Sequence, residues 1–118
     1  MTVLRFLMLV SSALAFLWYA GKDMRFHLVG RRVSGAENAM HGALGLSQLA
    51  LLVGAFFDAG AWAAGGALAT ALLGASDEYV FHRGIPGAES DLHAKAHLAL
   101  FIFVAVALAL PVLVNHAH

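Results

Sequence analysis

The sequence predicts an all-α integral membrane protein, a single domain over residues 1–118 that forms a bundle of four transmembrane helices. Of its 118 residues 61% are hydrophobic and only 12% are charged, and the mean hydropathy is +0.80. Soluble domains carry about twice that charged fraction. An apolar stretch of about 20 residues crosses a bilayer, and the chain holds four such stretches with short connections between them.

The four expected spans are separated by residues that interrupt an apolar helix. The first span is retained rather than cleaved as a secretory signal, because charged residues follow it in place of a cleavage site. Asp58-Ala59-Gly60 separates the second span from the third, and Gly84-Ile85-Pro86-Gly87 separates the third from the fourth. Glycine and alanine recur in the second and third spans, which favours close helix packing. The expected spans are residues 3–19, 36–57, 61–82 and 88–114.

The basic residues gather in two of the connections. The first and third connections hold most of the lysines and arginines, whereas the second connection and the C-terminal tail hold none. Cytoplasmic loops carry the excess of basic residues, so the sequence predicts that both termini lie outside and that the first and third connections are cytoplasmic. These basic residues are Lys22, Arg25, Arg31, Arg32, Arg83 and Lys95.

Two stretches share the pattern acid-x-x-Phe-His, loop, Gly-Ala-Glu-x-x-x-His. One runs from Asp23 to His41 and the other from Glu78 to His93, and each copy spans the end of one apolar stretch and the start of the next. The pattern predicts two tandem helical hairpins, residues 1–57 and 58–118, related by a pseudo-twofold axis along the membrane normal. Such an axis brings the two half-sites together.

Histidine follows a carboxylate by four residues in both halves of each copy, and residues four apart share one face of a helix. Four of the seven histidines lie at the predicted cytoplasmic face in this way, and His97, four residues after His93, joins them there. Imidazole and carboxylate together suit Fe, Mn, Zn or Cu, and the absence of cysteine leaves only nitrogen and oxygen as ligands. The candidate metal ligands are His27, Glu37, His41, Glu78, His82, Glu89, His93 and His97.

A simpler interpretation treats these residues as helix ends at the membrane interface. Glu37 and Glu89 favour the positive ends of helix dipoles, and Ser34 can form a capping box with Glu37. Capping explains the acids but does not call for histidine. Six positive charges balance six negative ones at this face, whereas a patch that binds lipid headgroups is normally net basic.

The spacing of Asp23, His27 and His41 resembles the Asp-x-x-x-His…His copper-binding pattern in the membrane subunits of particulate methane and ammonia monooxygenases. The clustered histidines also resemble the histidine boxes of membrane di-iron desaturases and hydroxylases, although the His-x-x-His-His pairs of those enzymes are absent. Both resemblances are confined to these residues. They imply oxygen or metal chemistry at a membrane face.

The sequence therefore favours a membrane metalloprotein with a mono- or dinuclear site at the cytoplasmic face, and the expected reaction is oxidation of a lipid-soluble substrate. The position equivalent to His97 in the first repeat is Gly45, so one metal would have an open coordination position. One alternative is a b-type haem electron carrier with His41 and His97 as axial ligands. Another is a non-catalytic accessory subunit that docks a membrane partner or forms a homo-oligomer. No motif for hydrolysis or nucleic-acid binding is found.

Overall fold

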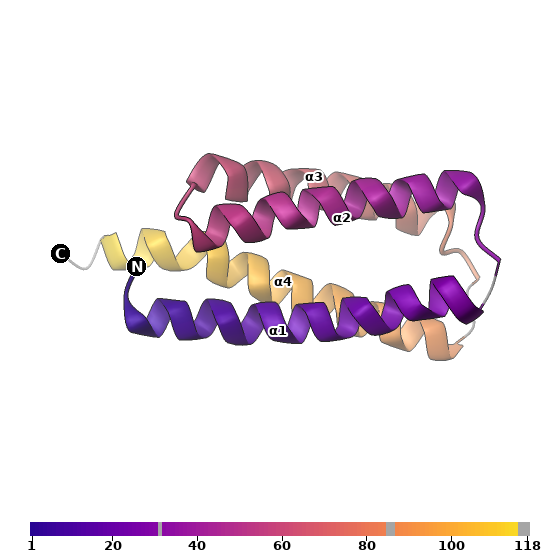
Figure 1. Cartoon of the computed structure of the whole chain (residues 1–118), viewed down its shortest axis with the longest axis horizontal. Helices are drawn as coiled ribbons and strands as arrows, with labels where there is room; N and C mark the ends of the chain where they lie inside the picture. Colours follow the sequence, from indigo (N-terminus) through magenta and orange to yellow (C-terminus); the bar gives the residue numbers. More distant parts are fainter. Residues whose placement is uncertain (31, 85–86, 116–118) are drawn as a thin grey trace.

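The computed structural model describes residues 1–30, 32–84 and 87–115, and over these residues the chain forms four α-helices, as the sequence predicts (Figure 1). A π-helical segment, η1, continues the first helix. The predicted break at Gly84-Ile85-Pro86-Gly87 lies partly outside the described residues, but α3 ends before it and α4 begins at Gly87. The elements are α1 (Val3–Arg25), η1 (Phe26–Gly30), α2 (Gly35–Phe56), α3 (Gly60–Val80) and α4 (Gly87–Asn115).

The helices pack as two antiparallel pairs, α1 with α4 and α2 with α3, which Figure 1 shows as two layers. The α1/α4 layer holds a stacked pair of rings, Phe16 and Phe103, whose centroids are 6.4 Å apart. The predicted hairpins, α1 with α2 and α3 with α4, are therefore not the most closely packed pairs. Their relation by a pseudo-twofold axis stays a prediction.

Two glycines set the close approach of α2 and α3. A methyl group at Gly54 would overlap the backbone of Ala63, and one at Gly66 would overlap the backbone of Leu51. Only hydrogen fits at these positions, which agrees with the close packing expected of the glycine- and alanine-rich spans.

Polar contacts fix both ends of α2. At its start, the Ser34 hydroxyl accepts a hydrogen bond from the Glu37 backbone amide at 3.1 Å, which confirms the serine half of the expected capping box. At its end, Asp58 adopts a left-handed backbone conformation (φ 55°) in the turn to α3. The Asp58 carboxylate also pairs with the guanidinium of Arg5, which ties α1 to this turn.

Among the described residues, three segments are long and apolar enough to cross a membrane: α1 together with η1, α2, and α4 up to Ala109. The helix α3 is not among them; eleven of its 21 residues are glycine or alanine, and Asp77 and Glu78 lie in its last turn. Large apolar side chains are exposed along the outside of all four helices, among them Leu14, Leu46, Leu68 and Ile102. The crossing of a membrane by all four helices stays a prediction.

Candidate metal centre

Five histidines form a row at the end of the bundle where η1 and the start of α4 lie. Successive ring centroids are 4.5 Å apart from His41 to His27, 5.3 Å from His27 to His82, 4.3 Å from His82 to His93 and 4.4 Å from His93 to His97. Residues on or beside all four helices contribute to this row. The sequence placed these histidines at one face, and the structure brings their rings into contact.

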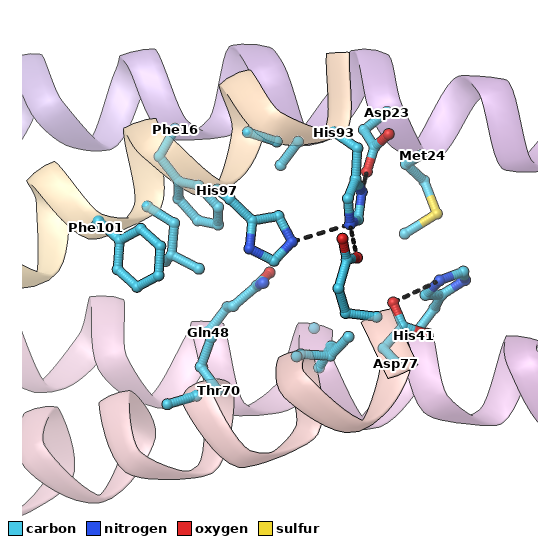
Figure 2. Close-up of a pocket in the computed structure, with 18 of the residues that line it drawn as sticks. Phe16, Asp23, Met24, His41, Gln48, Thr70, Asp77, His93, His97 and Phe101 are labelled. Carbon is cyan, nitrogen blue, oxygen red and sulfur yellow. Dashed lines mark hydrogen bonds and ion pairs between the residues drawn. The ribbon is translucent and has the colours of Figure 1, made fainter. Parts of the chain in front are cut away.

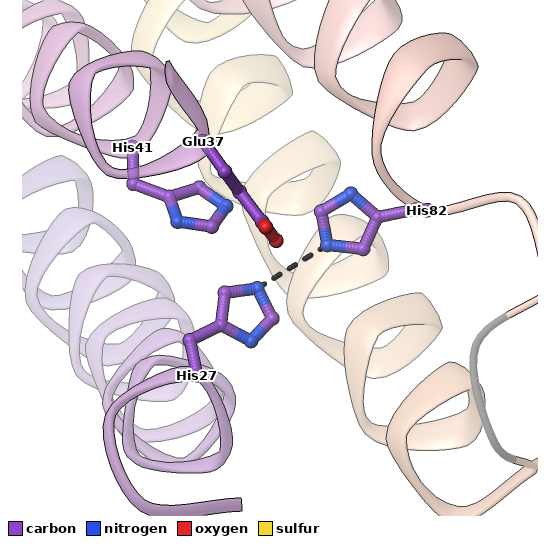
Figure 3. Close-up of side chains that lie close together, drawn as sticks. All are labelled: His27, Glu37, His41 and His82. Atoms are coloured by element: carbon purple, nitrogen blue, oxygen red, sulfur yellow. Dashed lines mark hydrogen bonds between the residues drawn. The ribbon is translucent and has the colours of Figure 1, made fainter. Parts of the chain in front are cut away.

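The first group in the row that could hold a metal ion consists of His27, Glu37, His41 and His82 (Figure 3). One nitrogen or oxygen from each of the four residues lies within 4.8 Å of all the others. The Nε2 atoms of His27 and His82 are 3.2 Å apart. Two nitrogens on one tetrahedral ion are separated by about 3.3 Å when the bonds are about 2.0–2.1 Å long, so this pair already has the spacing of two ligands.

The π-helical geometry of η1 positions His27. Of the five residues in η1 only His27 is buried, at 3% exposure, while Phe26, Leu28 and Val29 face outward. A π-helical turn changes the direction in which side chains leave a helix, and such turns are frequent at functional sites. The sequence predicted a first span over residues 3–19, and nothing in it indicated that the helix would widen at His27.

The second group consists of Glu78, His82 and His93, so His82 belongs to both. His93 lies between two carboxylates, with Nδ1 2.8 Å from Asp23 Oδ2 and Nε2 2.9 Å from Glu78 Oε2. Its Nε2 is also 3.0 Å from Nε2 of His97. These carboxylates come from α1 and α3, whereas the sequence pairing for His93 was with Glu89 on its own helix.

Asp77 was not among the predicted ligands, yet it lies at the junction of two site histidines. Its side chain is only 3% exposed, and Oδ2 lies 3.2 Å from Nδ1 of His82 and 3.5 Å from Nε2 of His41. A carboxylate in this position orients a histidine and increases its basicity as a ligand.

The charges at this end divide between the interior and the surface. Three carboxylates, those of Glu37, Asp77 and Glu89, are less than 5% exposed. Glu89 lies 3.4 Å from Nδ1 of His27, on the side of that ring away from His82. Every lysine and arginine described at this end is exposed, namely Lys22, Arg25, Arg32, Arg83 and Lys95. Over the described residues, carboxylates and imidazoles therefore make up the polar interior at this end.

All eight predicted ligands lie at this end, but they are not equivalent. Six of them belong to the first or second group, and one of the six, Glu78, is exposed. The other two lie outside the groups but contact one member each: Glu89 contacts His27, and His97 contacts His93. The candidate ligands did not include Asp77 or Asp23, although Asp23 belongs to the pattern that resembles a copper site, and the inward orientation of both depends on contacts between helices. In the sequence, both residues lie near the end of an apolar span next to another charged residue: Asp23 follows Lys22, and Asp77 precedes Glu78. This position could have indicated that they belong to the site.

A cavity of about 360 Å³ adjoins the row, between the α1/α4 pair and the α2/α3 pair (Figure 2). Its lining includes His41 and His97, the two residues expected to ligate haem in the alternative interpretation. However, Nε2 of His41 faces Asp77 and Nε2 of His97 faces His93. No protein-family model matches the chain, and no significant similarity to a curated protein or a solved structure is found. Fold and site together define a helical bundle with apolar outer surfaces and a buried histidine and carboxylate cluster at one end.

Proposed function

We propose that this chain is a membrane metalloprotein that holds one or two transition-metal ions in the histidine row. The observation that carries the proposal is the convergence of donor atoms: one nitrogen or oxygen from each of His27, Glu37, His41 and His82 lies within 4.8 Å of all the others, and three of these four residues are buried. Imidazole and carboxylate donors in this arrangement suit a divalent transition-metal ion.

The ligands fall into the two groups that share His82. His27, Glu37 and His41 complete one group, and Glu78 with His93 completes the other. Asp77 and Asp23 then orient ligating histidines through hydrogen bonds. Nitrogen and oxygen donors of this kind suit Fe, Mn, Zn or Cu. When bound, such an ion supplies a Lewis-acid or redox centre at the edge of the cavity.

An internal duplication is part of the same proposal. A twofold axis that exchanges α1 with α3 and α2 with α4 converts the α1/α4 pair into the α3/α2 pair, which are the two pairs that pack closely. It also exchanges His27 with His82, and these rings face each other at 3.2 Å. The contact of Glu89 with His27 then corresponds to the proximity of Glu37 to His82.

We propose further that all four helices cross a bilayer with the metal end in the cytoplasm. Because α3 packs along α2, which is apolar enough to span, the two would cross together. Exposed aromatic and basic residues pair at the metal end, with Lys22 4.6 Å above the Trp18 ring and Arg83 3.9 Å above the Tyr79 ring. Aromatic and basic side chains are typical of the membrane interface.

The first test is elemental analysis and an absorption spectrum of protein purified in mild detergent without a histidine tag. We expect one to two equivalents of a transition metal and no Soret band. A Soret band would instead indicate bound haem and favour the haem alternative, with His41 and His97 as the candidate axial ligands. Protein free of metal, which also fails to take up added zinc, copper, iron or manganese, would contradict the proposal and leave the accessory subunit as the best account.

A further inference from the structure

The cavity beside the histidine row has apolar walls and a polar end. Phe16 of α1 and Phe101 of α4 line it with aromatic rings, and Leu44 and Val104 add aliphatic surface. The α3 wall consists largely of small residues, among them Ala67, Ala71 and Gly74. Its volume of about 360 Å³ lies within the range of sites for small organic molecules.

Two polar side chains face this space from opposite pairs of helices. Figure 2 shows the Gln48 amide of α2 directed toward the ring of His97 on α4. Among the described residues, the Gln48 amide makes no hydrogen bond, and neither does Nδ1 of His97, whose other nitrogen faces His93. Both groups line the cavity and are available to a ligand inside it, and a polar side chain within an apolar helix usually marks a site.

The hydrogen-bonding capacity of these two groups limits the ligand. An amide both donates and accepts, and Nδ1 of an imidazole does either according to its tautomer. The pair therefore fits a carbonyl as well as a hydroxyl group. Two aromatic walls and a wall of small residues favour a flat ring, and entry from the bilayer requires that the rest of the molecule be apolar.

We propose that the cavity binds a quinone or its hydroquinone, with the ring between Phe16 and Phe101 and the oxygen hydrogen-bonded by Gln48 and His97. A ligand held there would lie beside the metal cluster, because His97 contacts His93. The role of that ligand as the substrate of the centre rests on the proposed function. Binding itself does not require the metal.

A matched pair of substitutions in α3 tests whether the cavity is the site. A Cβ at Gly74 would lie 3.9 Å from Cδ2 of Leu44 and 4.0 Å from Cε1 of His97, whereas one at Gly65 meets nothing within 4 Å. Gly74→Leu therefore fills the cavity at its polar end, and Gly65→Leu makes the same change on the outside of the same helix. A third variant, Gln48→Leu, removes the amide with little change of volume.

The probe is menadione, a methylated naphthoquinone, and methylnaphthalene is the control that lacks both carbonyl groups. Equilibrium dialysis in mild detergent should show saturable menadione binding to the original protein and to Gly65→Leu. We expect binding to be lost in Gly74→Leu and weakened about tenfold in Gln48→Leu, since one hydrogen bond is removed. Circular dichroism verifies that each variant is folded.

Equal binding by Gly74→Leu and Gly65→Leu would overturn the proposal. The proposal would also be overturned if methylnaphthalene bound as tightly as menadione and its binding were unaffected by Gln48→Leu. The cavity would then be an unspecific apolar space. Elemental analysis of the same samples separates the two proposals. Protein that holds metal but does not bind menadione overturns the quinone site alone, and protein that binds menadione but neither holds nor takes up metal overturns the metal site alone.

Discussion

Single side chains determine whether the histidine row can hold a cation, and Asp77 has the most constrained position among them. It is 3% exposed, its Oδ2 reaches both His41 and His82, and its buried Oδ1 has no hydrogen-bond partner among the described residues. A carboxylate placed in this way holds two imidazoles in fixed orientations. It also leaves one oxygen for which a cation or a water molecule is the natural partner.

Replacing Asp77 by asparagine keeps the size of the side chain but removes its charge. We expect Asp77→Asn to weaken metal binding by about 10- to 100-fold, because the histidines that it orients lose their carboxylate partner. Asp91→Asn is the matched control, since Asp91 is exposed and pairs with Lys95 on the surface of α4. The metal affinity of each variant can be measured by competition with a chromophoric chelator. Equal affinities for the two variants would contradict the role given to Asp77.

At the scale of the elements, the breaks between helices could be predicted and the packing partners could not. Polar and turn-forming residues such as Ser34 and Asp58 mark the ends of α2, so its bounds followed from the sequence. The partner of each helix depends on which face it presents, and faces rich in glycine, alanine and leucine look alike in sequence. The packing of α1 with α4 was therefore not foreseen.

The same limit applies to the site. Its location was predictable because carboxylates and histidines recur at the ends of apolar spans. The contacts that build it were not, because His93 takes its carboxylates from α1 and α3. The inward direction of His27 depends on the π-helical turn, for which no simple sequence signal exists.

The close approach of α2 and α3 provides a test at this scale. A methyl group at Gly66 would overlap the backbone of Leu51, whereas one at Gly65 meets open space. We expect Gly66→Ala to lower the free energy of unfolding by about 1–3 kcal/mol through overpacking. Gly65→Ala should raise it by about 0.5–1 kcal/mol, because alanine favours a helix over glycine. Thermal unfolding in detergent, followed by circular dichroism, measures both, and similar midpoints would contradict this packing.

At the scale of the whole molecule, apolar and polar surfaces are separated along the length of the bundle. Leucine and phenylalanine side chains are exposed on the outside, while most of the charge lies at the end that holds the histidine row. The ion pair of Arg5 with Asp58 lies at the opposite end, together with the start of α1 (Figure 1). This separation is what a short membrane protein with a site at one interface requires.

The proposed orientation can be tested by labelling, because the chain has no cysteine of its own. Phe57 in the α2–α3 turn and Ser90 near the start of α4 are exposed at opposite ends of the bundle. In intact cells, an impermeant thiol reagent should modify Phe57→Cys, and it should modify Ser90→Cys only after permeabilisation, because cytoplasmic loops carry the basic residues. The reverse pattern would invert the orientation, and modification of both without permeabilisation would argue against membrane insertion.

The most direct test of the metal centre is X-ray absorption at the zinc edge, on protein loaded with zinc and freed of excess metal. We expect a shell of nitrogen and oxygen at about 2.0–2.2 Å, with the outer-shell scattering of at least two imidazoles. That scattering should be weaker in His82→Asn, because His82 belongs to both ligand groups. Zinc that does not remain bound, or that shows only oxygen ligands without imidazole, would contradict a metal site in the histidine row.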